Sequence, residues 1–431
     1  MLDPRLLRER REEIVESCRR RRVSVDVDRA IAEHERVNAL VTELNELNRR
    51  RNEHQKSDLR RLDEAARAAH VESGRRLKDE VAALEERLRE RRAALDALLM
   101  ELPNFIHPDA PTGGEEDFRV VRAGEPARVS FPPLDHLARA ERHDLIDFEA
   151  GARVAGQKWY YLKNEAALLD VALTRFALDV LLAEGFVPVT TPDVARPDVV
   201  RGLGFNPRGA ETQIYSLANE ELCLVGTAEI TLGGMYAGQI VEESALPIRL
   251  AGVSHCFRTE AGTHGRESRG LYRVHQFTKT EMFVFCRPED SDAQHEQLRA
   301  LEERIFAALE LPFRVIDIAS GDLGAPAYRK YDLEVWMPGR GDGGGWGEVT
   351  STSNCTDFQA RRLACRFRRA GAKKPELLHT LNGTAISNAR AILALLEVHQ
   401  QADGTIAVPK ALVPYLGRER IGTPGAAARR G

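Results

Sequence analysis

The stretch from residue 27 to residue 102 contains no proline, and its apolar residues repeat in a way that few folds can satisfy. They recur at alternating spacings of four and three, which gives a helix one narrow apolar seam and is typical of coiled-coil pairing. One seam consists of Val37, Leu40, Leu44 and Leu47, and the other of Leu77, Val81, Leu84, Leu88, Leu95, Leu98 and Leu102, with Arg91 where an apolar residue is missing. The pattern predicts two paired helices.

Gly74 is the only glycine in this stretch and therefore predicts where the chain reverses. Two helices of about 30 residues each would form an antiparallel coiled-coil hairpin, on the order of 45 Å long at 1.5 Å per residue. Pro103 stops the second helix, and Pro108 marks a linker. The hairpin is either a dimerising coiled coil or a projecting arm that contacts a large partner, and the periodicity allows both.

The chain changes in character after the linker. Short β-rich apolar runs are separated by irregular loops rather than by regular helices, which predicts an antiparallel β-sheet flanked by helices. These runs are "FVPVTTP" (186–192), "LPIRLAGVSHCF" (246–257), "RVHQFTKTEMFVF" (273–285) and "LPFRVIDIA" (311–319), and a long amphipathic helix is expected over 165–185. The sequence has neither a P-loop nor a GxGxxG fingerprint, so a nucleotide would be held in another way. The predicted fold class is α+β with an N-terminal helical hairpin.

The composition excludes several classes of protein. A net charge of −4 argues against a protein that coats DNA, although it permits a local basic surface. No run approaches the roughly 20 apolar residues that cross a membrane. Six cysteines without a CxxC pair indicate reduced thiols, and His255-Cys256 lacks the partner ligands of a zinc site. The arginine-rich start also carries acids, unlike a transit peptide, so a cytoplasmic protein is expected.

The most charged short stretch is "FRTEAGTHGRESRGLYRVHQFTKTEMF", residues 257–283. Apolar residues resume in alternation at its end, which predicts two adjacent antiparallel strands joined by an arginine-rich loop. Arg258 and Glu260 would project from one strand, and Phe277 and Glu281 from the next. An arginine can hold a phosphate or a carboxylate through two hydrogen bonds, and a phenylalanine can stack on a base.

This stretch resembles motif 2 of class II aminoacyl-tRNA synthetases, and specifically that of the seryl-tRNA synthetase family. Further segments resemble that family in the same order along nearly the whole chain. They are "GFVPVTTP" with Pro192 (motif 1), "VGTAEI" (225–230, a serine-binding segment), "GEVTSTSNCTDFQARR" (347–362, an active-site strand) and "HTLNGTAISNARAILALLEVHQQADG" (379–404, motif 3). The N-terminal hairpin resembles the tRNA-binding arm of the family.

The resemblance implies a serine–tRNA ligase with two domains, a tRNA-binding arm over 1–108 and a catalytic domain over 109–425. Its substrates would be L-serine, ATP and tRNA(Ser), with tRNA(Sec) as a further candidate acceptor and Mg²⁺ accompanying ATP. A homodimer formed through the region around Pro192 is also implied. A repurposed paralogue, such as an amino-acid:carrier-protein ligase, is the alternative, although such proteins tend to lack the arm or the motif arginines.

The resemblance also assigns roles to individual residues. Arg258 and Arg390 would be catalytic, and Glu348 and Ser351 would hold Mg²⁺. The residues implied to bind serine are Thr227, Ala228, Glu229, Arg258, Glu281 and Thr384. Those implied to bind ATP are Arg258, Thr259, Glu260, Arg273, Val274, Phe277, Glu348, Val349, Thr350, Ser351 and Arg390.

Six basic residues on the first helix of the hairpin, toward its tip, are candidates for binding tRNA phosphates. They are Arg49, Arg50, Arg51, Lys56, Arg60 and Arg61. The alternative is an ordinary solvated face whose charge is balanced by Glu43, Glu46, Glu53 and Asp58.

Overall fold

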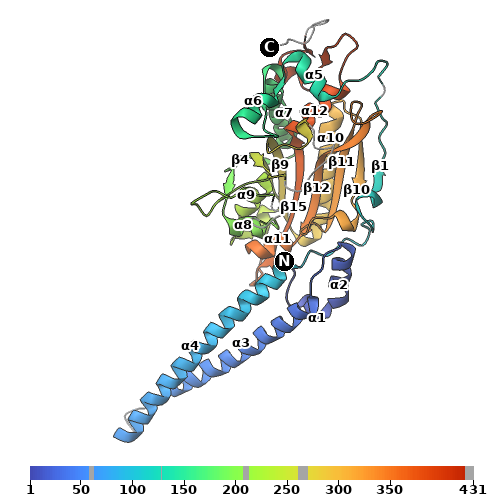
Figure 1. The fold of residues 1–431 in the computed structure, drawn as a ribbon. Helices are drawn as coiled ribbons and strands as arrows, with labels where there is room; N and C mark the ends of the chain where they lie inside the picture. The colour runs from blue at the N-terminus through green and yellow to red at the C-terminus, as the bar shows by residue number, and fades with distance from the viewer. Residues whose placement is uncertain (58–62, 128, 207–212, 261–269, 423–431) are drawn as a thin grey trace. The chain divides into compact units, whose positions relative to one another are not determined.

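The computed structural model describes residues 1–431 except 58–62, 128, 207–212, 261–269 and 423–431. The chain divides into two compact units, Met1–Phe105 and Ile106–Gly431. The first consists of helices and the second of a large, mostly antiparallel sheet with helices packed on it (Figure 1), so the predicted α+β fold class is confirmed. None of the described helices is both long enough and apolar enough to span a membrane.

The first unit is built on two long helices, α3 (Val27–Gln55) and α4 (Glu64–Glu101). The predicted apolar seam is buried at Leu40 on α3 and at Leu84 and Leu88 on α4. Arg91, at the missing apolar position, lies 3.4 Å from Glu33 of α3 as an ion pair. Two short helices, α1 (Leu6–Glu9) and α2 (Arg11–Arg20), join the same hydrophobic core.

The predicted reversal at Gly74 is wrong, because Gly74 lies inside α4. Helix α4 begins earlier because the side chain of Asp63 caps it by accepting a hydrogen bond from the backbone amide of Ala66. Gly74 instead provides room, since a Cβ atom there would lie 3.1 Å from Nε2 of His54. The His54 ring stacks on that of His70 with a centroid distance of 3.6 Å, so the glycine permits this contact between the helices.

The second unit is centred on an eight-stranded sheet. In spatial order its strands are β1 (Arg119–Arg122), β10 (Phe313–Asp317), β11 (Arg329–Met337), β12 (Gly345–Thr356), β15 (His379–Ser387), β9 (Gln276–Cys286), β8 (Ile248–Phe257) and β4 (Val187–Thr190). All neighbours pair antiparallel except β4 and β8, which are parallel. The predicted antiparallel sheet is therefore confirmed, with one parallel pair at this edge, where a long crossover connects the two strands.

The two faces of the sheet follow from the alternation of side chains along β9. Met282 and Val284 join one hydrophobic cluster with helices α7 (Asn164–Ala183), α10 (Ser291–Ala308) and α12 (Asn388–Val398). Phe283 and Phe285 join a second cluster with α8 (Pro197–Gly202), α9 (Ala228–Gly234) and α11 (Phe358–Leu363). The charged residues of β9 that precede Phe283 at a spacing of two must therefore share the face of α8, α9 and α11.

Short elements complete the second unit. They are helices α5 (His136–His143), α6 (Phe148–Ala155) and α13 (Val413–Leu416), and the small sheets β2–β3 (Ile146–Asp147, Tyr161–Leu162), β5–β6 (Val194–Ala195, Cys223–Leu224), β14–β13–β7 (Glu376–Leu377, Arg366–Arg368, Ile240–Glu242) and β16–β17 (Ile406–Ala407, Arg420–Ile421). All six cysteines of the chain are free and buried, as predicted for reduced thiols.

Candidate active site

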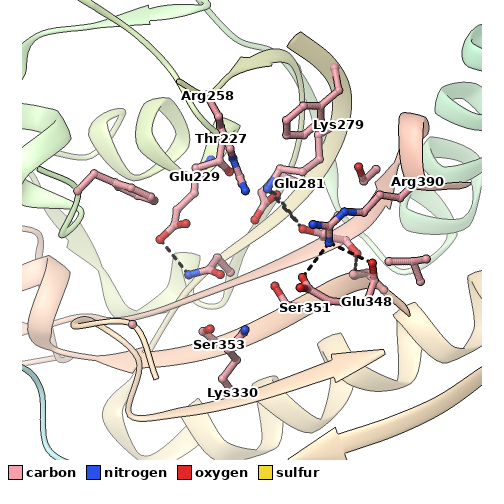
Figure 2. Close-up of a pocket in the computed structure, with 18 of the residues that line it drawn as sticks. Thr227, Glu229, Arg258, Lys279, Glu281, Lys330, Glu348, Ser351, Ser353 and Arg390 are labelled. Atoms are coloured by element: carbon pink, nitrogen blue, oxygen red, sulfur yellow. Dashed lines mark hydrogen bonds and ion pairs between the residues drawn. The ribbon is translucent and has the colours of Figure 1, made fainter. Parts of the chain in front are cut away.

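A pocket of about 550 Å³ lies on the face of the sheet that carries the charged residues of β9. Its walls come from β9, β12, β15, the loop after β8 and the starts of α9 and α12 (Figure 2). The residues predicted from the sequence that line it are Thr227, Glu229, Arg258, Glu260, Arg273, Val274, Phe277, Glu281, Glu348, Val349, Thr350, Ser351, Thr384 and Arg390. Residues from five separate segments of the sequence thus meet around one cavity.

One end of the pocket contains a buried carboxyl group, Glu229 at the start of α9. Its Oε1 accepts hydrogen bonds from Gln359 Nε2 at 2.7 Å and from Asn382 Nδ2 at 2.9 Å. Burial, together with the nearby charge of Glu281, raises the pKa of Glu229 to about 7. A cation that entered this end of the pocket would favour the ionised form, so Glu229 is suited to bind an ammonium group.

Beside Glu229, three side chains form a compact polar cluster. Lys279 and Glu281 are an ion pair on β9, and both are almost fully buried. Thr384 of β15 donates its hydroxyl to Glu281 Oε2 at 3.4 Å and accepts from Lys279 Nζ at 3.4 Å. Burial raises the pKa of Glu281, and the Lys279 ammonium opposes that shift. The cluster offers both donors and acceptors to a small hydroxyl group.

Two arginines add positive charge to the pocket, and one of them, Arg258, lies beside Thr227 and Glu229 (Figure 2). The Arg258 guanidinium lies 5.4 Å from the centre of the Phe277 ring, and its Nε donates to the carbonyl of Gly226 at 3.4 Å. Arg273 pairs with Glu260 at 3.4 Å. Two cations and an aromatic ring along one wall can hold an anionic group beside a planar base.

Arg258 and Glu260 do not project from β8 itself, as the sequence predicted, because the strand ends at Phe257. The backbone amide of Arg258 still bonds to the carbonyl of His275, which extends the pairing by one residue. Glu260 then turns away with a φ of 49°, in the left-handed region. This turn brings the Glu260 carboxyl group back toward Arg273.

Arg390 enters the pocket from the start of α12. It contacts the Glu348 carboxylate at 3.0 Å and the Glu348 carbonyl at 3.1 Å, and its guanidinium lies 4.8 Å from the centre of the Tyr272 ring. Desolvation raises the pKa of Glu348, but the charges of Arg390 and Lys330 outweigh it and lower the pKa to about 2. Glu348 is therefore ionised at neutral pH.

The oxygen atoms near Glu348 suit a hard divalent cation. The Ser351 hydroxyl faces the pocket from the same strand. Behind them, Asp332 pairs with Lys330 through one oxygen at 3.0 Å, while its buried Oδ1 has no hydrogen-bond partner among the described residues. Carboxylate and hydroxyl oxygens are ligands that Mg²⁺ prefers, so Glu348 and Ser351 fit this ion when phosphates complete its shell.

Two predicted residues do not line the pocket. Ala228 is fully buried, and its methyl group packs under Gly252 of β8 in the core. The backbone amide of Thr259 bonds to the carbonyl of Gln213. Neither residue is among those that line the cavity.

Several lining residues were missed by sequence reasoning, including Lys279, Asn382, Lys330 and Tyr272. The signal for the first two was available: Lys279 lies midway between Phe277 and Glu281, and Asn382 lies two residues before Thr384, so strand alternation puts each on the pocket face. No comparable signal points to Lys330 or Tyr272.

The predicted tRNA-binding residues lie in the first unit. Arg49, Arg50 and Arg51 are on α3, and Lys56 caps its end. Arg49 pairs with Glu46 at 2.6 Å and with Glu53 at 2.8 Å, as in the alternative of a solvated, charge-balanced face. Arg60 and Arg61 lie outside the described residues.

Comparisons with known proteins agree over both units. Residues 1–106 match the seryl-tRNA synthetase N-terminal domain, and residues 214–399 match the tRNA synthetase class II core domain (G, H, P, S and T). A serine–tRNA ligase of Rhodopirellula baltica is 54% identical over 97% of this chain and 98% of its own length. One of Rubrobacter xylanophilus is 52% identical over 98% of this chain and 99% of its own length.

Two solved structures are also similar along the whole chain. Seryl-tRNA synthetase from Pyrococcus horikoshii, complexed with ATP, has a TM-score of 0.87 and 38% identity, covering 98% of this chain and 99% of that one. Cytoplasmic serine–tRNA ligase from Naegleria fowleri, in complex with AMP, has a TM-score of 0.84 and 29% identity, covering 100% and 99%.

Proposed function

We propose that this chain, which belongs to the seryl-tRNA synthetase family of class II aminoacyl-tRNA synthetases, activates L-serine with ATP and transfers it to tRNA(Ser). The observation that carries the proposal is a single pocket that combines an ammonium-binding carboxyl group, a cluster suited to a hydroxyl and an arginine-rich wall. These three features match the amino group and the hydroxyl of serine and the phosphates of ATP.

The first step joins two anions, because the serine carboxylate attacks the α-phosphorus of ATP and releases pyrophosphate. Stabilising the negative charge of the pentavalent phosphate is then the main demand on the protein. Arg258 stabilises this charge by contacting both the α-phosphate and the serine carboxylate. Arg273 and Arg390 hold the γ-phosphate of a bent ATP.

The adenine ring stacks on Phe277, and its amino group donates to Glu260. Glu348 and Ser351 hold Mg²⁺, which supplies further neutralisation of the phosphate charge when bound. Backbone groups of Val274, Val349 and Thr350 complete the ATP site, whereas Thr259 lies outside the pocket and only connects Arg258 to Glu260. In the second step the ribose hydroxyl of the terminal tRNA adenosine attacks the seryl-adenylate carbonyl and AMP leaves.

Serine is selected by its two polar groups. Thr227 and Glu229 receive its ammonium group, while Glu281 and Thr384 bond its hydroxyl. A site built around a substrate hydroxyl discriminates by roughly 10⁴ or more against analogues that lack it, because its own polar groups are then left unpaired. Alanine and glycine are rejected on this basis.

Replacing Thr384 by alanine is expected to raise the Michaelis constant for serine by about tenfold, the equivalent of one hydrogen bond, and to leave that for ATP within about twofold. The hydroxyl removed by this change lies 3.4 Å from both Glu281 and Lys279, whereas the phosphate-binding arginines are untouched. Initial rates of pyrophosphate exchange at varied serine and varied ATP give both constants. A variant in which only the ATP constant rises would place Thr384 in the wrong subsite.

The experiment that tests the function itself is ATP–pyrophosphate exchange with each of the twenty amino acids, followed by charging of tRNA(Ser) and tRNA(Sec) transcripts. Exchange stimulated by serine alone, and serine attached to tRNA(Ser), are expected. Exchange that responds to another amino acid would refute the proposal. Transfer of serine to a carrier protein instead of tRNA would favour the repurposed paralogue.

The division of labour between the units is part of the same proposal. Residues 1–108 form the arm that binds tRNA, and residues 109–425 form the catalytic domain. The presence of the paired helices together with Arg258 and Arg390 favours tRNA over a carrier protein as the acceptor. A cytoplasmic location fits these substrates.

We also propose that the chain forms a homodimer through the region of α7, β4 and Pro192. Leu168, Val171 and Leu182 on α7 are 49%, 68% and 43% exposed, and Val187 is 56% exposed on β4, the edge strand of the sheet. Apolar side chains gathered beside an unpaired strand edge favour association with a second copy.

Replacing Val171 by glutamate is therefore expected to shift the protein from dimer to monomer at micromolar concentration, because the charge would be buried in the interface. Sedimentation velocity measures the change. The same substitution at Val71, an exposed valine on α4, is the matched control and should leave the dimer intact. A wild-type protein that sediments as a fully active monomer would contradict the proposal.

A further inference from the structure

The strands β12 and β15 separate where the pocket begins. Their backbone pairing ends at Thr352 and Gly383, within the described part of both strands. Beyond this point the hydroxyl of Thr350 donates a hydrogen bond to the carbonyl of Thr384. A side chain, not a backbone amide, therefore links the two strands beside the hydroxyl-binding cluster.

Glu302 of α10 lies behind this link, on the face of the sheet opposite the pocket. It is 1% exposed, and its carboxyl group lies within hydrogen-bonding reach of the Thr350 side chain. A Cβ atom on Gly383 would lie 3.2 Å from Oε1 of Glu302, so the glycine provides room for the carboxyl group. Oε1 has no hydrogen-bond partner among the described residues.

The direction of the hydrogen bonds determines which form of Glu302 fits. A threonine hydroxyl has one hydrogen, and that of Thr350 is already donated to the carbonyl of Thr384. Only lone pairs remain on the Thr350 oxygen, so a bond to Glu302 requires a hydrogen on Glu302. An ionised Glu302 would compete for the Thr350 hydrogen and remove the donor from Thr384.

The charged surroundings also favour the neutral acid. The charged groups that act on Glu302 are acids on three elements: Asp332 on β11, Glu281 on β9 and Glu303 on α10 itself. The lysines nearby, Lys330 and Lys279, are engaged with Asp332 and Glu281. Burial is the main reason why the pKa of Glu302 is raised well above its usual value. A hydrogen donated by Thr350 would favour the ionised form and oppose this shift, whereas the three acids add to it.

We propose that Glu302 is a positioning residue for serine: as a carboxylic acid it donates a hydrogen bond to Thr350, and so keeps the Thr350 hydroxyl on the carbonyl of Thr384. The inference rests on the proposed function of the pocket and deepens it. Thr384 carries the hydroxyl that contacts Glu281 and Lys279, so its backbone position sets the geometry of the hydroxyl-binding cluster. Glu302 acts on the substrate from behind the sheet without touching it.

The test compares Glu302→Gln with Glu302→Met, because the two side chains have nearly the same volume but only the amide donates a hydrogen bond. In pyrophosphate exchange, Glu302→Met should raise the Michaelis constant for serine about tenfold, with kcat and the constant for ATP within about twofold. For Glu302→Gln, kcat and the Michaelis constants for serine and ATP should all stay within about threefold of the wild-type values. Glu303→Gln is the control: this adjacent, partly buried acid pairs with Arg299 and Arg122 and does not contact Thr350, so the substitution should change none of the three constants.

Two further measurements separate positioning from a general structural role. Thr350→Val should reproduce the serine defect of Glu302→Met, and the double variant should be no worse than either, since both break one chain of contacts. The pH dependence of serine binding between pH 6 and pH 8 should be the same for the wild type and Glu302→Gln, because the proposed hydrogen bond to Thr350 requires Glu302 to be the neutral acid throughout.

Several outcomes would overturn the inference. They are a Glu302→Gln variant as impaired as Glu302→Met, a Glu302→Met variant with an unchanged serine constant, and a wild-type ionisation between pH 6 and pH 8 that Glu302→Gln lacks. Absence of serine-dependent exchange in the wild type would instead refute the function of the pocket. A Glu302→Met protein that loses ATP and serine binding equally would show that Glu302 only supports the fold.

Discussion

Replacing Arg258 by alanine should lower the rate of seryl-adenylate formation by a factor of about 10²–10³, while the protein remains folded. The Arg258 guanidinium lies in the pocket near Phe277, where the α-phosphate and the serine carboxylate are proposed to meet. Without its charge, the negative charge that develops in the transition state would have no main stabilising partner. Serine-dependent pyrophosphate exchange measures the rate, and thermal unfolding measures whether the fold survives.

Arg249 provides the matched control for this substitution. It lies on the same strand, β8, and donates to Gln294 and Gln297 outside the pocket, so Arg249→Ala should retain normal exchange. Arg258→Lys should recover only part of the rate, because lysine keeps the charge but cannot bond two groups through a planar fork. Near-normal exchange by a folded Arg258→Ala protein would remove Arg258 from the reaction.

Much of the fold could be predicted because it depends on repeated patterns. The seams at Leu40 and at Leu84 and Leu88 are buried as expected, since a spacing of four and three leaves a helix only one apolar stripe. The predicted reversal of the chain near Gly74 was wrong for a physical reason. A glycine only weakens a helix, whereas the Asp63 cap starts one, and the stacking of His54 on His70 depends on contacts between helices that periodicity does not describe.

The pocket could be predicted in part because its residues occupy motifs that resemble a known family. A motif identifies positions, but it does not say whether a side chain or the backbone faces the cavity. For this reason Ala228 was predicted to bind serine, although its methyl group is buried under β8. Asn382 and Gln359 hold Glu229 from other strands and helices, and Glu302 acts from the far face of the sheet. Such contacts arise only when segments far apart in the sequence pack together.

The second large effect is expected when the helical arm is shortened, and it concerns the charging of tRNA. Paired helices cannot read bases in the deep groove of an RNA helix, so recognition should depend on shape and on backbone charge, chiefly along the long variable arm of the tRNA. A shortened arm must preserve the core at its base, where α1 and α2 pack on α3 and α4. The Glu33–Arg91 pair and the His54–His70 stack set the register of the hairpin, so residue 42 lies opposite residue 82.

Replacing residues 42–82 by a short Gly-Ser turn should therefore leave the base of the arm intact and keep Leu40 packed near Leu84. Serine-dependent pyrophosphate exchange should remain within about twofold of the wild type, because the pocket lies wholly in residues 106–431. Charging of tRNA(Ser) should fall by a factor of about 10² or more, and the salt slope of tRNA binding should fall by roughly 0.7–0.9 for every phosphate that the shortened arm no longer neutralises.

Binding measured from 50 to 200 mM salt gives that slope, and a full-length variant with Arg50 and Arg51 replaced by glutamine should show an intermediate effect. If exchange and charging fell equally, the arm would be structural, and if charging were undiminished, the helices would not bind tRNA.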